Sequence, residues 1–331
     1  MNRAELLARI APYEYYDNSR LVKTRGCIRR AFYEQIGPRG TGLTSGTGDG
    51  ATFGSVFHEG CAEYYRNFHL PMKDRRLHAL DFTEKFYSTK FDPNRLDIDK
   101  KHTKWNALVL LDAYFEQFKR EDENYEILAA ELGLAYLIKP RPGDPPDFKV
   151  PFWYLGRMDG LYARRSTGER LVKEMKTMGS GDPAKRLELL RFNRQPVGYV
   201  SLVREYLASI GDTRNCSMFL GDVVLVSHTL FEFARDDFEV SQQRLASWRF
   251  QTILMVEEWR RFKRTMQDHF DDYNYFDYAI QDTEECNKYN MICSFYKLCQ
   301  FGPMSPSLAD YKPEVWTPFE DLRNDDIKFI E

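Results

Sequence analysis

The sequence lacks the features by which membrane and secreted proteins are recognised. No apolar run reaches the roughly eighteen residues that a membrane-spanning helix needs. The stretch from Met1 to Arg20 has no apolar segment of the signal-peptide kind. We therefore expect no membrane contact and a cytoplasmic location, which would be the host cytoplasm if the protein is viral. In such a reducing compartment, the six cysteines are expected to be thiols or metal ligands rather than disulfides.

The sequence also lacks the basic excess of a protein that coats duplex DNA. Lys and Arg number 47 and Asp and Glu number 50, so the formal net charge is −3. Any surface that binds nucleic acid must therefore be local. The glycine-rich stretch 37–50 has no Gly-Lys-Ser/Thr ending, which excludes a nucleotide-binding P-loop there.

The hydrophobic period changes along the chain and predicts three consecutive parts. Residues 1–120 are mostly of helical pattern, residues 121–280 form the core, and residues 281–331 are irregular and rich in cysteine. We expect the third part to pack back on Cys27, so that the three parts make one integrated domain.

Within the core, short apolar segments bounded by turn residues predict strands at 125–138, 152–163 and 169–177, the last two joined as a hairpin. A helix disturbed by Pro196 is expected over 182–210. One or two further strands and a long helix follow. This order, with helices before and after, predicts an α/β sandwich.

The hairpin carries the residues that point to chemistry. Asp159 lies on its first strand, and Glu174, Met175 and Lys176 lie on its second. Because side chains alternate along a strand, Glu174 and Lys176 share one side, and strand pairing brings Asp159 close to Glu174. Adjacent carboxylates repel unless a cation lies between them, and oxygen ligands suit Mg²⁺ or Mn²⁺. A charged surface hairpin without function is the alternative.

In the arrangement of Asp159, Glu174 and Lys176, the chain resembles the PD-(D/E)XK nuclease superfamily, and most closely its RecB-like branch. The resemblance implies an α/β, restriction-endonuclease-like core, with a mixed central sheet flanked by helices. It implies that Asp159, Glu174 and the carbonyl of Met175 bind the metal and that Lys176 assists the attacking water. It further implies that His58, in Gly-x-x-x-His, is a metal ligand, and that Gln195 and Tyr199, spaced by four on one helix face, position substrate.

Glu131 matches an acidic position of the same family. The resemblance implies a ligand to the metal or to a second metal. An exposed strand residue is the alternative.

Four cysteines form a second candidate site. Cys286, Cys293 and Cys299 cluster in the sequence, and Cys27 is the best candidate to complete a four-thiolate set. The pattern resembles RecB-like nucleases that carry a 4Fe–4S cluster, including the AddB nuclease part and CRISPR-associated four-cysteine nucleases. Six residues separate Cys286 from Cys293 where that family commonly has two. A zinc site or unligated thiols are the alternatives, although no short zinc knuckle is present.

The function that the resemblance implies is a Mg²⁺- or Mn²⁺-dependent DNA exonuclease acting in recombination, repair or replication-linked end processing. Its partner would be DNA that is single-stranded or has free ends. No helicase motif is present, so a helicase or recombination partner would do any unwinding. The alternatives are a structure-directed or restriction-like endonuclease, a nuclease acting on RNA, and a non-cleaving DNA-binding scaffold. Basic residues gather in two places, Lys23, Arg25, Arg29 and Arg30, and Lys185, Arg186, Arg191 and Arg194, where phosphate contacts are expected.

Overall fold

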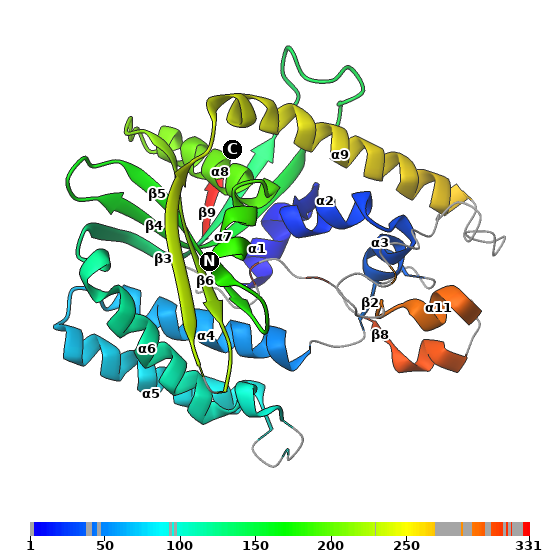
Figure 1. The fold of residues 1–331 in the computed structure, drawn as a ribbon. Coiled ribbons are helices and arrows are strands. Elements are labelled where there is room, and N and C mark those ends of the chain that lie inside the picture. Colours follow the sequence, from blue (N-terminus) through cyan, green and yellow to red (C-terminus); the bar gives the residue numbers. More distant parts are fainter. Residues whose placement is uncertain are drawn as a thin grey trace.

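The fold was analysed in a computed structural model of the chain (Figure 1). It describes residues 3–37, 42–44, 48–92, 95, 98–228, 230–268, 286, 293–301, 306–313, 316, 319 and 327–331. Much of the predicted cysteine-rich part 281–331 therefore lies outside the described residues. Among the described helices, none combines the length and apolar character that crossing a bilayer requires.

A mixed sheet forms the centre of the molecule, as the sequence predicts. In the described part of the chain it has seven strands, in the order β7-β6-β5-β4-β3-β9, with β1 pairing to β4. Neighbours β3–β4, β4–β5 and β6–β7 run antiparallel, and β5–β6, β3–β9 and β1–β4 run parallel. The strands are β1 Glu14–Asp17, β3 Tyr125–Ile138, β4 Phe152–Arg164, β5 Arg170–Met178, β6 Cys216–Leu225, β7 Glu232–Glu239 and β9 Ile327–Ile330.

Helices cover both faces of this sheet (Figure 1). One face packs against α4 Asp49–Arg66, α5 Met72–Lys90 and α6 Lys104–Asp122 in a core rich in Phe and Tyr, including a closely stacked pair, Tyr64 and Phe115. The other face packs against α7 Pro183–Leu190, α8 Arg194–Ser209 and α9 Gln242–Asp268. The chain is thus an α/β protein with a mixed central sheet between helical layers.

The predicted helix over 182–210 is two helices. Helix α7 ends at Leu190 and α8 begins at Arg194, with Asn193 as N-cap accepting from the Gln195 N–H at 2.9 Å. Pro196 falls in the first turn of α8, where backbone N–H groups have no partner within the helix. The expected distortion at Pro196 is therefore wrong, because a proline in that turn costs no hydrogen bond.

The two ends of the chain meet beside the sheet. The N-terminal elements are α1 Arg3–Ile10, α2 Asn18–Arg25, α3 Ile28–Gln35 and β2 Leu43–Thr44. The C-terminal ones are α11 Tyr296–Phe301, the 3₁₀ helix η4 Pro306–Asp310, and β8 Lys312–Pro313, which pairs with β2. The Tyr33 ring stacks on that of Phe295 with centroids 5.5 Å apart, and its hydroxyl donates to the Leu298 carbonyl at 3.3 Å. The described C-terminal residues thus pack on α3, next to Cys27.

Candidate metal site at a fork in the sheet

Two strands separate at the position of the predicted carboxylates. Strand β5 pairs with β4 from Ala163 only as far as Gly160, which lies opposite Lys173. On the same edge of β4, β1 pairs only with Phe152 to Leu155. The intervening stretch of β4 contains Asp159, whose carboxylate accepts the backbone N–H of Met175. This fork leaves room for polar side chains inside the sheet.

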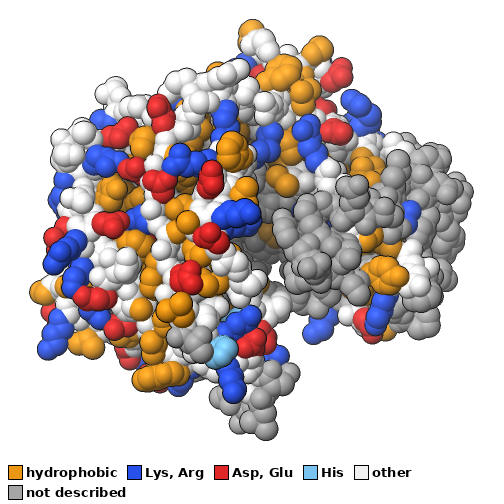
Figure 2. All heavy atoms as spheres, viewed as in Figure 1, with side chains coloured by type: hydrophobic (Ala, Val, Ile, Leu, Met, Phe, Trp, Pro, Cys, Tyr) orange, Lys and Arg blue, Asp and Glu red, His pale blue; other side chains and the backbone are white. Residues whose placement is uncertain are grey.

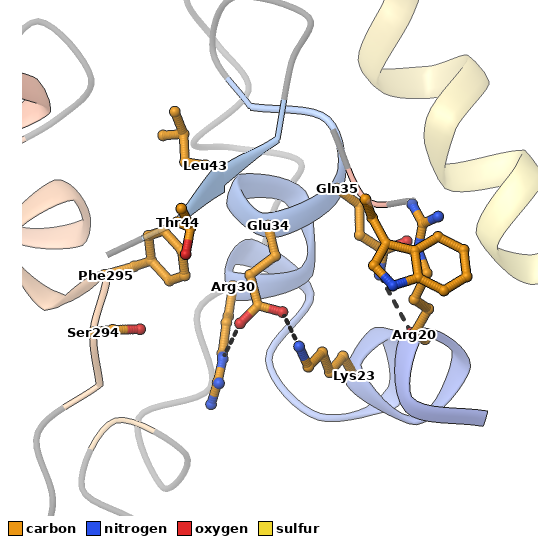
Figure 3. A pocket seen from close by; sticks show the side chains of 10 residues that line it. Arg20, Lys23, Arg30, Glu34, Gln35, Leu43, Thr44, Ser294 and Phe295 are labelled. Carbon is orange, nitrogen blue, oxygen red and sulfur yellow. Dashed lines mark hydrogen bonds and ion pairs between the residues drawn. The ribbon is translucent and has the colours of Figure 1, made fainter. Parts of the chain in front are cut away.

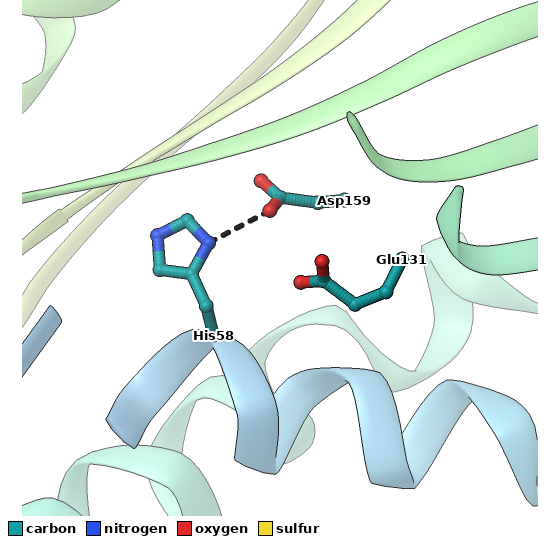
Figure 4. Close-up of side chains that lie close together, drawn as sticks. All are labelled: His58, Glu131 and Asp159. Carbon is teal, nitrogen blue, oxygen red and sulfur yellow. Dashed lines mark hydrogen bonds and ion pairs between the residues drawn. The ribbon is translucent and has the colours of Figure 1, made fainter. Parts of the chain in front are cut away.

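The fork gathers His58, Glu131 and Asp159, which come from α4, β3 and β4 (Figure 4). One potential ligand atom from each lies within 4.8 Å of the others. The His58 Nδ1 lies 2.7 Å from the Asp159 Oδ1. Residues separated by up to 101 positions thus form the compact acidic group that the sequence could only suggest.

Glu131 is held in place by a charged chain that the sequence patterns did not indicate. Its side chain is only 1% exposed, so the alternative of an exposed strand residue is wrong. Arg157 donates from Nε to the Glu131 Oε2 at 2.5 Å and from Nη2 to the Glu59 carboxylate at 2.7 Å. The sequence did contain a signal for Arg157 and Glu59: Arg157 is two residues before Asp159 on the same strand, and Glu59 directly follows His58 on the same helix. Glu131 also has a φ of 58°, rare for a residue with a side chain.

Glu174 and Lys176 lie together with the helix pair Gln195 and Tyr199. Lys176 donates to the Glu174 carboxylate. The Gln195 amide donates to the Glu174 Oε1 at 3.0 Å and to the Tyr199 hydroxyl at 2.8 Å. Met175 points its side chain to the other face, where the Tyr114 hydroxyl lies 3.3 Å from its sulfur. The predicted alternation and the shared face of Gln195 and Tyr199 are both present.

Burial governs the electrostatics of the fork. It raises the pKa of Glu131 and of Glu174 to about 7, and the charge of Asp159 adds to both shifts. Burial opposes ionisation of Asp159 as well, but His58, Lys176 and the Met175 N–H outweigh it and lower its pKa. Ionising all three buried carboxylates is unfavourable because of desolvation and mutual repulsion, and a bound cation would offset both effects.

The donor set fits a divalent metal ion. Glu131 Oε1 and Glu174 Oε2 are buried and have no hydrogen-bond partner among the described residues. Unpartnered buried acceptors are costly unless a cation or water satisfies them. Carboxylate oxygens with one imidazole suit Mg²⁺ or Mn²⁺ better than a soft metal. Glu174 stands outside the close group of three, beside Lys176.

Helix α4 comes close enough to deliver His58 because of one glycine. A Cβ added at Gly54 would lie 2.8 Å from the Thr177 hydroxyl oxygen on β5, closer than real Cβ contacts come. Gly54 is four residues, about one helical turn, before His58. The Gly-x-x-x-His spacing thus has a packing reason as well as a chemical one.

The four predicted cluster cysteines lie in one neighbourhood. Cys27 is the buried N-cap of α3, and the half-buried Cys293 and Cys299 pack at the α3–α11 contact. The Cys293 N–H donates to the Cys286 carbonyl at 2.8 Å. Burial raises the pKa of Cys299 to about 11, and the charges of the other three thiols add to the rise. In the described part of the chain, no three of the sulfur atoms lie within 4.8 Å of one another.

Two other cysteines are separate from that neighbourhood. Cys61 on α4 and Cys216 on β6 are buried in the apolar cores of opposite sheet faces.

The remaining buried charges form a group behind the fork that the sequence did not reveal. On the face of β5 opposite Glu174, Lys173 and Arg235 both donate to Asp222, which also accepts from Tyr114. Lys173 and Asp222 are 0% exposed.

Comparison with known proteins adds little to this description. No protein-family model matches the chain, and no curated protein matches it. A solved structure titled "Crystal structure of SSO0001" is similar at 13% identity, over 73% of this chain and 76% of that chain, with a TM-score of 0.26. So low a TM-score carries no argument about fold or function, and the assignment of the site therefore rests on the chain's own residues.

Proposed function

We propose that this protein is a metal-dependent DNA nuclease that hydrolyses phosphodiester bonds from strand ends, with a RecB-like PD-(D/E)XK core. The observation that carries the proposal is the fork itself. It holds His58, Glu131 and Asp159 within 4.8 Å and sets Lys176 on the Glu174 carboxylate at its rim. Glu131 and Glu174 each keep a buried oxygen that has no hydrogen-bond partner in the described part of the chain, and a metal ion would use these oxygens.

Each residue has a role that follows from its place. His58, Glu131, Asp159 and Glu174, with the carbonyl of Met175, would hold the ion. A bound Mg²⁺ or Mn²⁺ polarises the phosphodiester and lowers the pKa of a water ligand. Lys176 keeps a positive charge beside Glu174, where it can orient the attacking water and stabilise negative charge that develops on the phosphate. Gln195 donates to both Glu174 and Tyr199 and so fixes their orientation; held in this way, Gln195 and Tyr199 would position the substrate strand.

Digestion of end-labelled linear DNA tests the proposal. Single- and double-stranded DNA are incubated with Mg²⁺ or Mn²⁺ and the wild type, Glu174→Ala or Glu126→Ala. Glu126 is a matched control, an exposed carboxylate on β3, the strand that carries Glu131. We expect shortening from the ends by the wild type and the control, and none by Glu174→Ala. Absence of cleavage by the metal-loaded wild type would overturn the proposal in favour of a non-cleaving scaffold.

Two further substrates separate the variants of this function. Cleavage of closed circular DNA would identify an endonuclease, since an exonuclease needs an end. A matched RNA strand digested as fast as DNA would move the substrate class to RNA. We propose that any unwinding comes from a helicase or recombination partner, in keeping with an end-processing role.

We also propose that Cys27, Cys286, Cys293 and Cys299 bind a 4Fe–4S cluster that joins the chain ends. Four thiolates could ligate either a zinc ion or a 4Fe–4S cluster. The cluster is favoured here because the sequence has no short Cys-x(2–4)-Cys knuckle of the kind that zinc sites use.

Iron, sulfide and zinc content of the anaerobically purified protein tests this assignment. We expect iron and sulfide in the wild type, their loss in Cys299→Ser, and their retention in Cys216→Ser, which removes a buried thiol elsewhere. Zinc in place of iron, or a full cluster in Cys299→Ser, would refute it.

A further inference from the structure

A cavity of about 280 Å³ lies outside the fork, where the two chain ends meet (Figure 3). Its walls come from helices α2 and α3, strand β2, the two residues directly before α11 (Ser294 and Phe295) and Trp316. The volume is at the lower limit of ordinary ligand sites and suits a single nucleotide unit better than a larger molecule. None of the proposed metal or cluster ligands lines it.

Four charged side chains line this cavity, and three of them are cations. Glu34 pairs with Lys23 at 2.7 Å and with Arg30 at 2.8 Å. Arg20 is the third cation, and its guanidinium has no carboxylate partner among the described residues. The excess of positive charge inside a protein with net charge −3 marks the cavity as a place for an anionic group such as phosphate.

Stacked planar groups lie beside the cavity, together with a buried acceptor that has no partner among the described residues. The Arg20 guanidinium lies 4.7 Å from the centre of the Trp316 ring, and Tyr15 packs on the same ring with centroids 5.4 Å apart. Such stacked planes bind nucleobases without regard to sequence. Gln35 donates to the Arg20 carbonyl at 3.3 Å, but its Oε1 is buried without a hydrogen-bond partner among the described residues. Every base carries an N–H group that could donate to it.

Further cations lie on helices α2, α8 and α9, which pack on one another: Arg25 on α2, Arg194 on α8 and Arg244 on α9. Arg25 is on α2, the helix of Arg20 and Lys23. Arg194 directly precedes Gln195, which contacts Glu174. Over the visible face as a whole, Lys and Arg side chains are mixed with those of Asp and Glu (Figure 2).

We propose that the cavity lined by Arg20, Lys23, Gln35 and Trp316 binds one nucleotide of a single-stranded DNA whose scissile phosphate lies at the fork. The phosphate contacts the cations, and the base stacks on Trp316 within reach of the Gln35 Oε1. This inference rests on the proposed function, since it takes the same DNA strand as ligand. The cavity would hold the strand in register while the fork cuts it.

Binding without cleavage tests the inference separately from catalysis. The 331-residue chain, with its metal removed by EDTA, is titrated against a fluorescent oligonucleotide of about 20 nucleotides, which is longer than a typical single-strand site. The variants are Lys23→Gln, Trp316→Leu and Trp316→Phe. Lys119→Gln is the matched control, because Lys119 is similarly exposed and also pairs with a glutamate, but lies on α6.

We expect Trp316→Leu to weaken binding by roughly 5- to 150-fold and Trp316→Phe to retain most of the affinity, because phenylalanine keeps a stacking face. Lys23→Gln should reduce the slope of log affinity against log salt by about 0.7, the value for one phosphate contact on a single strand, and Lys119→Gln should leave it unchanged. Ultraviolet crosslinking of 5-iodouracil-labelled DNA should map to Trp316.

Three results would overturn the inference. Equal affinities of Trp316→Leu and wild type would leave the proposed nuclease function standing and remove the cavity from it. Competition by inorganic phosphate as strong as by a deoxynucleotide would show an anion site without base recognition. A wild type that does not bind DNA at all would refute both the cavity and the proposed nuclease function. By contrast, a wild type that binds DNA through Trp316 but does not cleave it would refute only the nuclease function.

Discussion

Adding Mn²⁺ to the metal-free protein should raise its melting temperature, because the ion would bind a site that exists only in the folded chain. The fork brings His58, Glu131 and Asp159 within 4.8 Å, whereas in the unfolded chain they are spread over about a hundred residues. Binding to the folded state alone stabilises it by an amount that grows with metal concentration. The effect is therefore a direct measure of the assembled site and needs no substrate.

The size of the shift depends on metal concentration and on chain length. At a concentration one hundred times the dissociation constant, binding adds about 2.7 kcal/mol. The unfolding entropy of about 2.1 cal/mol/K per residue, over 331 residues, converts this into a rise of about 4 °C. If Glu131→Gln weakens metal binding about a hundredfold, the same concentration adds only about 0.4 kcal/mol, which is less than about 1 °C.

Differential scanning calorimetry over a Mn²⁺ series measures these shifts. The comparison includes Glu126→Gln, which removes a carboxylate from the exposed start of the same strand and should show the full rise. A wild-type melting temperature that does not move with Mn²⁺ would refute the metal site. A full rise in Glu131→Gln would remove Glu131 from the ligand set and leave the other residues.

Three further predictions concern the structure around the fork. Asp222→Asn should lower the free energy of unfolding by about 3–5 kcal/mol in urea titrations, because it leaves buried Lys173 and Arg235 without their carboxylate. A decrease of less than about 1 kcal/mol would contradict the prediction. Burial opposes ionisation of Asp222, but Arg235 and Lys173 outweigh it and hold its pKa at about 2. Since that pKa lies below the unfolded value of about 4, ionised Asp222 contributes roughly 2 kcal/mol to the free energy of unfolding above pH 4, and this contribution is lost as the pH falls to about 2. Unfolding curves measured across that pH window should show the loss in the wild type and not in Asp222→Asn. Gly54→Ala should reduce metal-dependent cleavage by roughly ten- to hundredfold, because the added Cβ would meet the Thr177 hydroxyl and move α4. Adding Thr177→Ala should restore part of the rate. A fully active Gly54→Ala variant would contradict this prediction, because it would show that α4 can shift without loss of activity.

Much of the fold followed from the sequence because its signals are local. The strands at 125–138, 152–163 and 169–177 and their hairpin were predicted within a residue or two, since alternation and turn residues act over a few positions. Alternation likewise put Glu174 and Lys176 on one side of β5 and Met175 on the other. The break at Asn193 was missed, because a capping side chain competes with the helix period and local pattern alone does not decide between them.

The assignment of side chains to a site depended on contacts between distant parts of the chain. The sequence by itself determined the hairpin, the carboxylates and lysine on its strands, and the helix pair Gln195 and Tyr199. It also determined that the four candidate cluster cysteines come from the two ends of the chain. Only the tertiary structure decided that β1 and β5 share one edge of β4 and leave a fork between them, that Glu131 is buried on Arg157, and that the end segments enclose a cationic cavity. The physical reason is that period and turn chemistry act between neighbours in sequence, whereas burial and charge pairing are settled by residues that meet only when the whole sheet is assembled.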